Sequence, residues 1–126
     1  MRYALITVAV AALITAPVAA SGTRAPTPKE RSSLIQLVRA YVESTCCDGI
    51  KRIKIDYVVV STADPRWAEV VMQAWDKQLA YLGGDAAVLH RSKLTGRWSL
   101  NYLGADSVVC AAPPKVRDDL RLRCPK

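Results

Sequence analysis

The chain has 126 residues, of which 18 are lysine or arginine and 11 are aspartate or glutamate, so its formal net charge is +7. This length allows one domain with its own core and excludes two independently folded domains. A basic surface of this kind attracts polyanions without selecting among them, and it serves solubility equally well.

The first twenty residues predict a cleaved signal peptide. Arg2 supplies the charged start, and residues 4–16 are apolar apart from two threonines. Small residues then place the cleavage between Ala20 and Ser21. The apolar run is shorter than the about 20 residues that a membrane-spanning helix requires, so we expect no transmembrane anchor. We therefore expect a secreted or periplasmic protein, and removal of one arginine with residues 1–20 leaves 17 basic and 11 acidic side chains, a charge of +6.

Residues 21–27 are rich in turn formers and predict a flexible lead-in. Thr27, Pro28 and Glu30 then have the spacing of a capping box, with proline at the first helical position. Apolar side chains recur at helical spacing over the next four turns, at Leu34, Ile35, Val38, Tyr41 and Val42. We expect an amphipathic helix over 28–44, which opens a single domain over 28–126.

Residues 51–62 predict a strand, in which Ile53, Ile55, Tyr57 and Val59 alternate with polar residues and should share one face. The half from Tyr57 to Val60 is apolar on both faces, as expected where a sheet is covered on both sides. A turn at 63–66 leads to 67–75, which we interpret as the returning strand, with a helix as the alternative.

Residues 76–85 predict a short helical turn or loop. Two strands at 86–92 and 97–104 follow as a hairpin, with Trp98, Leu100 and Tyr102 on one face of the second strand. A short apolar edge at 107–110 and one helical turn at 116–122 complete the chain.

The predicted fold class is α+β, with an N-terminal amphipathic helix packed on a meander of about four antiparallel strands and a disulfide-closed C-terminal tail. Cystatin-like and nuclear-transport-factor-like folds share this order of elements. That analogy concerns the layout alone and assigns no function.

Four cysteines allow three pairings, and such a count is typical of disulfide-bonded exported proteins. Cys110 and Cys124 form the easier bridge, which in the chain-entropy model contributes roughly 3 kcal/mol. Cys46 and Cys47 are adjacent. A structural bridge, one spare thiol and a redox or soft-metal pair all remain open for them.

Several segments resemble small exported bacterial proteins of no assigned function. They are Asp64-Pro65-Arg66-Trp67-Ala68, Gly96-Arg97-Trp98, Leu103-Gly104, and the run that includes Cys110, Pro113, Val116-Arg117-Asp118-Asp119-Leu120-Arg121-Leu122 and Cys124. The resemblance covers most of residues 28–125. It implies a secreted single domain whose last two cysteines pair, and no activity to carry over. Cys46-Cys47 departs from that pattern.

The sequence contains no convergent set of catalytic groups. His90 is the only histidine, so there is no second imidazole for a relay or a metal site. Zinc, phosphate-loop and nucleophile-elbow motifs are also missing. We therefore predict no catalytic residue, no metal, no cofactor and no enzymatic activity.

The candidate interaction surface combines basic and aromatic side chains. Two tryptophans directly follow an arginine, an arrangement that can form an aromatic platform for sugars or bases, although core packing of the tryptophans is the alternative. The residues are Lys51, Arg52, Lys54, Arg66, Arg97, Trp67 and Trp98.

The leading hypothesis is a non-enzymatic exported interaction domain that binds an anionic cell-envelope component or another extracytoplasmic protein. A cystatin-like small-ligand carrier or enzyme is the alternative, and a protease inhibitor acting through the loop at 93–96 is a further one. No motif specific for nucleic acid is present.

Overall fold

The computed structural model describes residues 22–45, 50–76 and 81–126. Its elements form one antiparallel sheet in the order β1-β2-β3-β4-β5, together with two helices. In chain order they are β1 (Thr23–Arg24), α1 (Pro28–Thr45), β2 (Ile50–Ser61), β3 (Trp67–Asp76), β4 (Tyr81–Arg91), β5 (Trp98–Gly104) and α2 (Pro114–Leu120). The predicted α+β class and its meander are confirmed, and residues 67–75 are strand, not helix.

The sheet has one strand more than expected. Thr23 and Arg24, predicted as part of the flexible lead-in, form β1 and pair with Ser61 and Val60 of β2. The backbone N–H of Thr62 also donates to the carbonyl of Gly22 at 3.0 Å. A two-residue strand is too short to show an alternating sequence pattern. It is a strand only because it pairs with the edge of β2 that β3 leaves free.

The strand β4 begins at Tyr81, so the prediction of a turn or loop through residue 85 was wrong. Its two glycines suggested a turn, yet Gly84 lies opposite Gln73 and Asp85 opposite Met72 in the ladder with β3. Pairing with a long neighbouring strand outweighs the low strand preference of glycine.

The first turn of α1 contains the predicted capping box. The Glu30 N–H donates to Thr27 Oγ1 at 3.2 Å, and the Thr27 N–H donates to Glu30 Oε1 at 3.0 Å. The Arg24 guanidinium also donates one hydrogen bond to each carboxylate oxygen of Glu30, at 3.0 and 3.1 Å. This hydrogen bond from Arg24, with smaller help from Thr27, lowers the pKa of Glu30 from 4.5 to about 2 although burial opposes the change.

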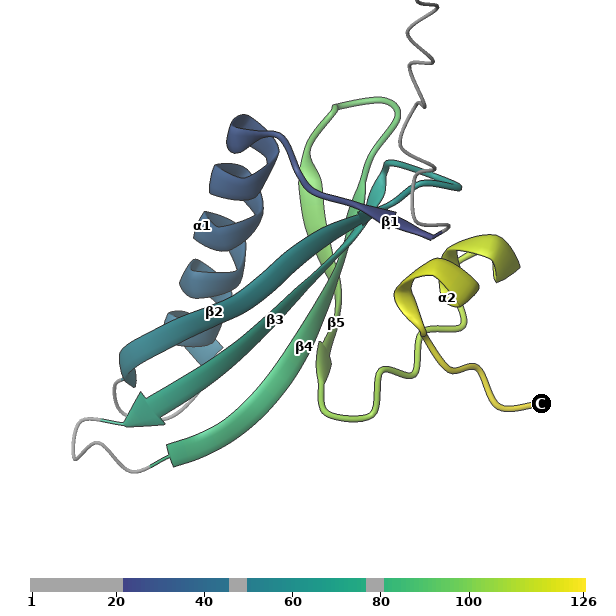
Figure 1. Cartoon of the computed structure of the whole chain (residues 1–126). Coiled ribbons are helices and arrows are strands. Elements are labelled where there is room, and N and C mark those ends of the chain that lie inside the picture. The colour runs from purple at the N-terminus through teal and green to yellow at the C-terminus, as the bar shows by residue number, and fades with distance from the viewer. Residues whose placement is uncertain (1–21, 46–49, 77–80) are drawn as a thin grey trace, which may run out of the picture.

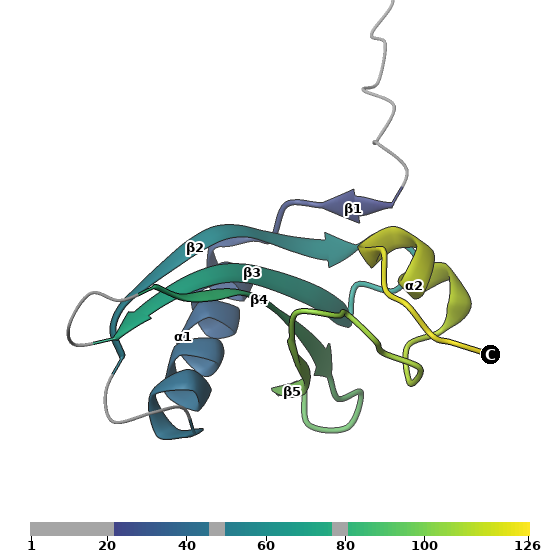
Figure 2. The same cartoon turned by 90° about the horizontal axis from the view of Figure 1, so that it is seen from below.

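The two faces of the sheet carry separate apolar clusters. Figure 1 shows α1 on one side of the strands and α2 on the other. Figure 2 shows β2 and β3 curving across α1, with α2 beyond the end of β2. The cluster under α1 includes Leu34, Val38, Val60, Val70 and Leu89. The cluster under the C-terminal segment includes Trp67, Val88, Val109, Val116 and Leu120. The expected cover on both faces of β2 is therefore present.

Two register shifts change which side chains share a face. The ladder of β2 with β3 shifts between Ile55 and Tyr57. Ile53 and Ile55 pack in the α1 cluster, whereas Val59 packs in the C-terminal cluster and Tyr57 hydrogen-bonds Glu69 on that same side. The prediction that these four residues share one face was wrong, because a bulge adds one residue to the period of two.

A second shift, between Val88 and Leu89, acts on β5 in the same way. Trp98 and Leu100 pack in the α1 cluster, and Tyr102 packs in the C-terminal cluster. The predicted common face of these three residues was therefore wrong as well.

The C-terminal segment is fixed by a disulfide and by a buried polar contact. Cys110 and Cys124 are bonded, with their Cα atoms 4.9 Å apart, as predicted. Asp119 Oδ2 accepts hydrogen bonds from Ser61 Oγ at 2.7 Å and from the Ala63 N–H at 2.9 Å. Ser61 is completely buried and Asp119 is half-buried, so this contact joins α2 to the end of β2 at the margin of the core.

Neither described helix is long and apolar enough to cross a bilayer.

The Asp119 contact predicts a measurable loss of stability in Asp119→Ala. The substitution leaves the buried Ser61 hydroxyl and the Ala63 N–H without their acceptor, so the free energy of unfolding should fall by about 1–3 kcal/mol. Asp118→Ala removes a neighbouring exposed carboxylate from the same helix and should stay within about 0.5 kcal/mol of wild type. Urea unfolding measures both. Equal destabilisation of the two variants would contradict this assignment.

The capping box predicts a defined pH dependence. The pKa of Glu30 is lower in the folded chain than its ordinary 4.5, so ionised Glu30 stabilises the fold above that value and this contribution is lost as pH falls towards about 2. The difference in unfolding free energy between wild type and Glu30→Gln should therefore shrink across that interval. The exposed carboxylate of α1 gives the control, Glu43→Gln. A difference that stays constant down to pH 2 would refute the role of the carboxylate charge.

Candidate functional site

The predicted basic surface is divided between the two ends of the sheet. Arg52 and Lys54 lie near the start of β2, where the Arg52 guanidinium is 4.2 Å from the centre of the Trp75 ring. Lys51 precedes them in β2, and its side chain lies outside the described set. Arg97 is at the opposite end, in the connection between β4 and β5. The predicted residues therefore do not form one patch.

The other three predicted residues also have structural contacts. Trp67 is only 5% exposed and its ring centre is 4.4 Å from that of His90, so it belongs to the core. Arg66 forms two hydrogen bonds to Asp64, of 3.0 and 2.8 Å. Burial raises the pKa of Asp64, but the bonds from Arg66 outweigh that effect and lower it overall. Trp98 is half-buried against the α1 cluster.

Basic side chains gather at one end of the molecule, around a hollow of about 470 Å³. Its lining residues are Arg24, Thr27, Lys29, Glu30, Ser33, Arg91, Gly96 and Trp98. The Arg91 guanidinium lies 5.5 Å from the centre of the Trp98 ring, and exposed Lys93 and Arg97 sit in the adjoining hairpin. We call Lys29, Arg91, Lys93 and Arg97 the basic end.

The four cations of the basic end have no acidic partner among the residues that the structure describes. In that part of the chain the ion pairs are Arg24 with Glu30, Lys54 with Asp56 and Arg66 with Asp64. Of these four cations the sequence predicted only Arg97. Lys29 comes from the start of α1 and Arg91 from the end of β4, so only the tertiary fold brings them to the hollow that the neighbours of Arg97, Gly96 and Trp98, also line.

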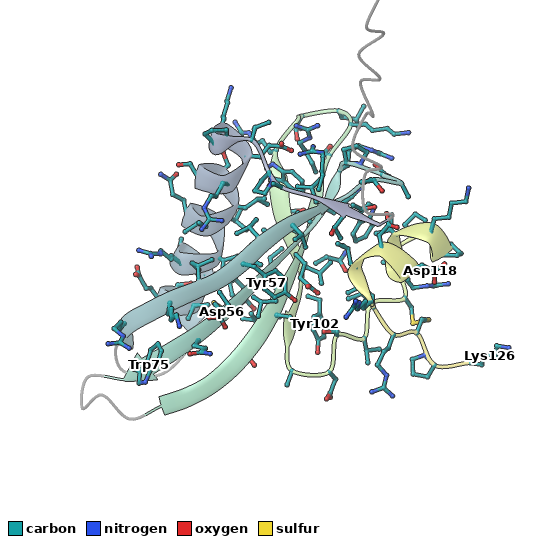
Figure 3. The ribbon with its side chains drawn as sticks, viewed as in Figure 1. Asp56, Tyr57, Trp75, Tyr102, Asp118 and Lys126 are labelled. Atoms are coloured by element: carbon teal, nitrogen blue, oxygen red, sulfur yellow. A yellow bond between two sulfur atoms is a disulfide. The ribbon has the colours of Figure 1, made fainter. Side chains whose placement is uncertain are left out.

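A second hollow lies on the other face of the sheet, against α2. It has a volume of about 660 Å³ and we call it the sheet cleft. Its lining combines apolar residues of the central strands with polar residues of α2 and the neighbouring loops: Thr23, Tyr57, Val59, Glu69, Val71, Ala86, Ser107, Asp118, Asp119, Leu120 and Arg121. Figure 3 shows Tyr57 and Tyr102 on this side of the sheet, with Asp118 on α2 and Trp75 at the far end of the strands.

A buried carboxylate lies in the sheet cleft. Glu69 is only 6% exposed, and its Oε1 accepts a hydrogen bond of 3.1 Å from the hydroxyl of Tyr57. Burial raises the pKa of Glu69, and the bond from Tyr57 offsets only part of that rise. Burial also raises the pKa of Tyr57, with the neighbouring charge of Glu69 and the hydrogen bond adding to it. In the described segments, no basic side chain forms an ion pair with Glu69.

The sequence analysis missed Glu69 and Tyr57. Glu69 is the single charged residue in the run Trp67–Met72, which is otherwise apolar, and a lone charge in a buried strand is the signal that could have identified it. Tyr57 joins it only because of the bulge that precedes Val58 in β2.

Metal ligation finds no support in residues 22–45, 50–76 and 81–126, where no three His, Cys, Asp or Glu side chains lie close enough to hold an ion. Cys46 and Cys47, for which a redox or soft-metal role was considered, lie outside the described residues.

No family model, curated protein or solved structure matches this chain, and we therefore infer its function from its own side chains.

Proposed function

We propose that this protein is an exported, non-enzymatic domain that binds an anionic polymer of the cell envelope through its basic end. The observation that carries the proposal is the set of four cations, Lys29, Arg91, Lys93 and Arg97, which gather at one end without an acidic partner in the described part of the chain.

The position of these cations favours a polymer over a single small anion. Lys29 belongs to α1, and the other three belong to the end of β4 and the hairpin that follows it. Lys29 and Arg91 line the hollow, whereas Lys93 and Arg97 are exposed in the hairpin whose Gly96 and Trp98 line it, so the four cations do not converge on one buried point. Exposed cations need little desolvation, so each contact should be weak and their sum should depend strongly on salt.

Trp98 adds a surface that is not purely electrostatic. It lines the hollow, is half-buried, and has the Arg91 guanidinium over its ring. A ring face beside a guanidinium can contact a sugar or another flat unit while the cation meets a neighbouring anionic group. This supports a polymer that carries both, such as an anionic glycan.

The extracytoplasmic part of the proposal has two supports. The disulfide between Cys110 and Cys124 is typical of oxidising compartments. The leader pattern before Ser21 predicts export, and it lies outside the described residues. Both features agree with an encounter in the cell envelope.

Binding to heparin, used as the anionic polymer, tests the proposal across a salt series. The probe is the chain from Ser21 onward, and the test variant is Lys29→Gln with Lys93→Gln and Arg97→Gln. Each lost contact should lower the slope of log affinity against log salt by nearly one, so this variant should lose up to about three and elute at lower salt.

The matched control removes the same charge elsewhere, with Arg39→Gln, Arg123→Gln and Lys126→Gln, three exposed positions outside the basic end. Both variants then carry the same net charge, and the control should retain most of the wild-type binding. If both lose affinity equally, net charge alone acts and the basic end is not a site. If wild type is not retained even at low salt, the electrostatic function itself is refuted.

A further inference from the structure

We propose that the sheet cleft is a second binding site, which takes a small amphipathic amine whose ammonium group meets Glu69. This goes beyond the proposed polymer-binding function, and it concerns the opposite face of the sheet. The ligand class follows from three features: one carboxylate oxygen without a hydrogen-bond donor, the charges around that carboxylate, and the apolar floor of the cleft.

One oxygen of Glu69 is open to the cleft. Within the described part of the chain, Tyr57 is the only hydrogen-bond partner of the Glu69 side chain, and it donates to Oε1. Among the described residues, every fully buried side-chain oxygen or nitrogen has a partner. Oε2 has no such partner, so this atom cannot be fully buried. The small exposed fraction of Glu69 therefore includes Oε2, and Glu69 lines the cleft. Glu69 is therefore more than nine-tenths buried, and its Oε2, which has no partner among the described residues, keeps some exposure where the residue lines the cleft.

The polar groups around Glu69 favour a cation. The Tyr57 hydroxyl uses its hydrogen for Glu69, so its oxygen has only acceptor capacity left. Asp118 and Asp119 add two further carboxylates to the lining, against Arg121 as the single basic side chain there. An ammonium group has three donors and no acceptor. It can serve both Oε2 and the tyrosine oxygen, which an anionic ligand cannot do.

Burial increases the benefit of such a pairing. A carboxylate held away from water without a counter-charge is destabilised, and a cation that arrives with its own hydrogen bonds relieves this cost. The raised pKa of Glu69 reports the same desolvation. A neutral apolar ligand would cover the carboxylate without neutralising it and should bind less well.

The floor of the cleft explains why the amine should carry an apolar body. Val59, Val71 and Ala86 contribute half-buried side chains from β2, β3 and β4, and Leu120 closes the cleft from α2. The volume of about 660 Å³ falls within the range of roughly 300–1,000 Å³ that is usual for small-molecule sites. A bare ammonium ion would leave this apolar surface unused.

Tryptamine and its neutral analogue 3-ethylindole test the proposal, because they share the ring and differ in the ammonium group. Amide chemical shifts of the chain from Ser21 onward follow the titration. Tryptamine should perturb amides of the central strands and α2 at millimolar concentration or below, and it should bind at least about tenfold more tightly than 3-ethylindole. Equal affinity for the two, or no perturbation of the cleft by tryptamine, would overturn the proposal.

Glu69→Gln keeps the shape and the acceptor for Tyr57 but removes the charge. It should lower the affinity for tryptamine about tenfold or more without lowering that for 3-ethylindole, whereas Glu43→Gln, on exposed α1 surface, should change neither. Ala86→Leu fills part of the floor without touching a charge and should weaken both ligands, which keeps the proposal testable if Glu69→Gln does not fold. Wild-type affinity for tryptamine in either folded cleft variant would refute it. None of these results depends on heparin retention, so the two proposals stand or fall separately.

Discussion

The carboxylate of Asp119 joins the C-terminal helix to the turn that connects the two central strands, 56 to 58 positions away in the chain. Its Oδ2 accepts from the fully buried Ser61 hydroxyl, which in turn accepts from the Asp64 N–H at 3.2 Å. Because α2 has only seven residues, it cannot be stable by itself. This polar contact, the apolar cluster beneath α2 and the disulfide together hold it on the sheet, and the wall of the sheet cleft depends on its position.

The bulge in β2 explains how one strand can serve two faces. Before the shift Ile55 packs under α1, and after it Val58 does so, which leaves Tyr57 on the side of Glu69. A strict alternation would have placed Tyr57 with Ile55 in the α1 cluster. The irregularity thus brings a hydroxyl to the buried carboxylate, in keeping with the frequent use of bulges to redirect side chains at sites.

Local signals in the sequence were sufficient for the helix, the antiparallel meander and the disulfide. The capping box at Thr27 and the apolar spacing through Val42 determine α1, and the spacing of Cys110 and Cys124 suits a short closed loop. Strand β1 and the first residues of β4 could not be predicted, because only neighbouring strands make them extended. Bulges are equally invisible to a period-of-two argument, so the faces of Tyr57 and Tyr102 were assigned incorrectly.

The candidate sites were harder to predict than the fold for the same reason. Arg97 could be selected from its sequence neighbours, but Lys29 and Arg91 come to the same end of the molecule, beside Gly96 and Trp98, only through tertiary packing. Trp67 was selected in the same way beside Arg66, yet it belongs to the core, because the C-terminal segment packs over it with Val109 and Val116. Adjacent residues in the sequence show which chemical groups could act together. They do not show whether those groups are exposed in the fold.

Opposite local charges on the two faces need not interfere with each other. The chain is basic overall, with a formal net charge of +7, which would disfavour a cationic ligand if net charge alone decided binding. At physiological ionic strength, however, exposed charges are screened beyond about 8 Å, so the cations of the basic end act mainly at their own surface. Glu69 is desolvated, and its interactions are screened far less than those of exposed groups. A weakly screened carboxylate inside the cleft can therefore dominate over a larger number of screened cations outside it, and one small domain can present an anion-binding surface and a cation-binding cavity at once.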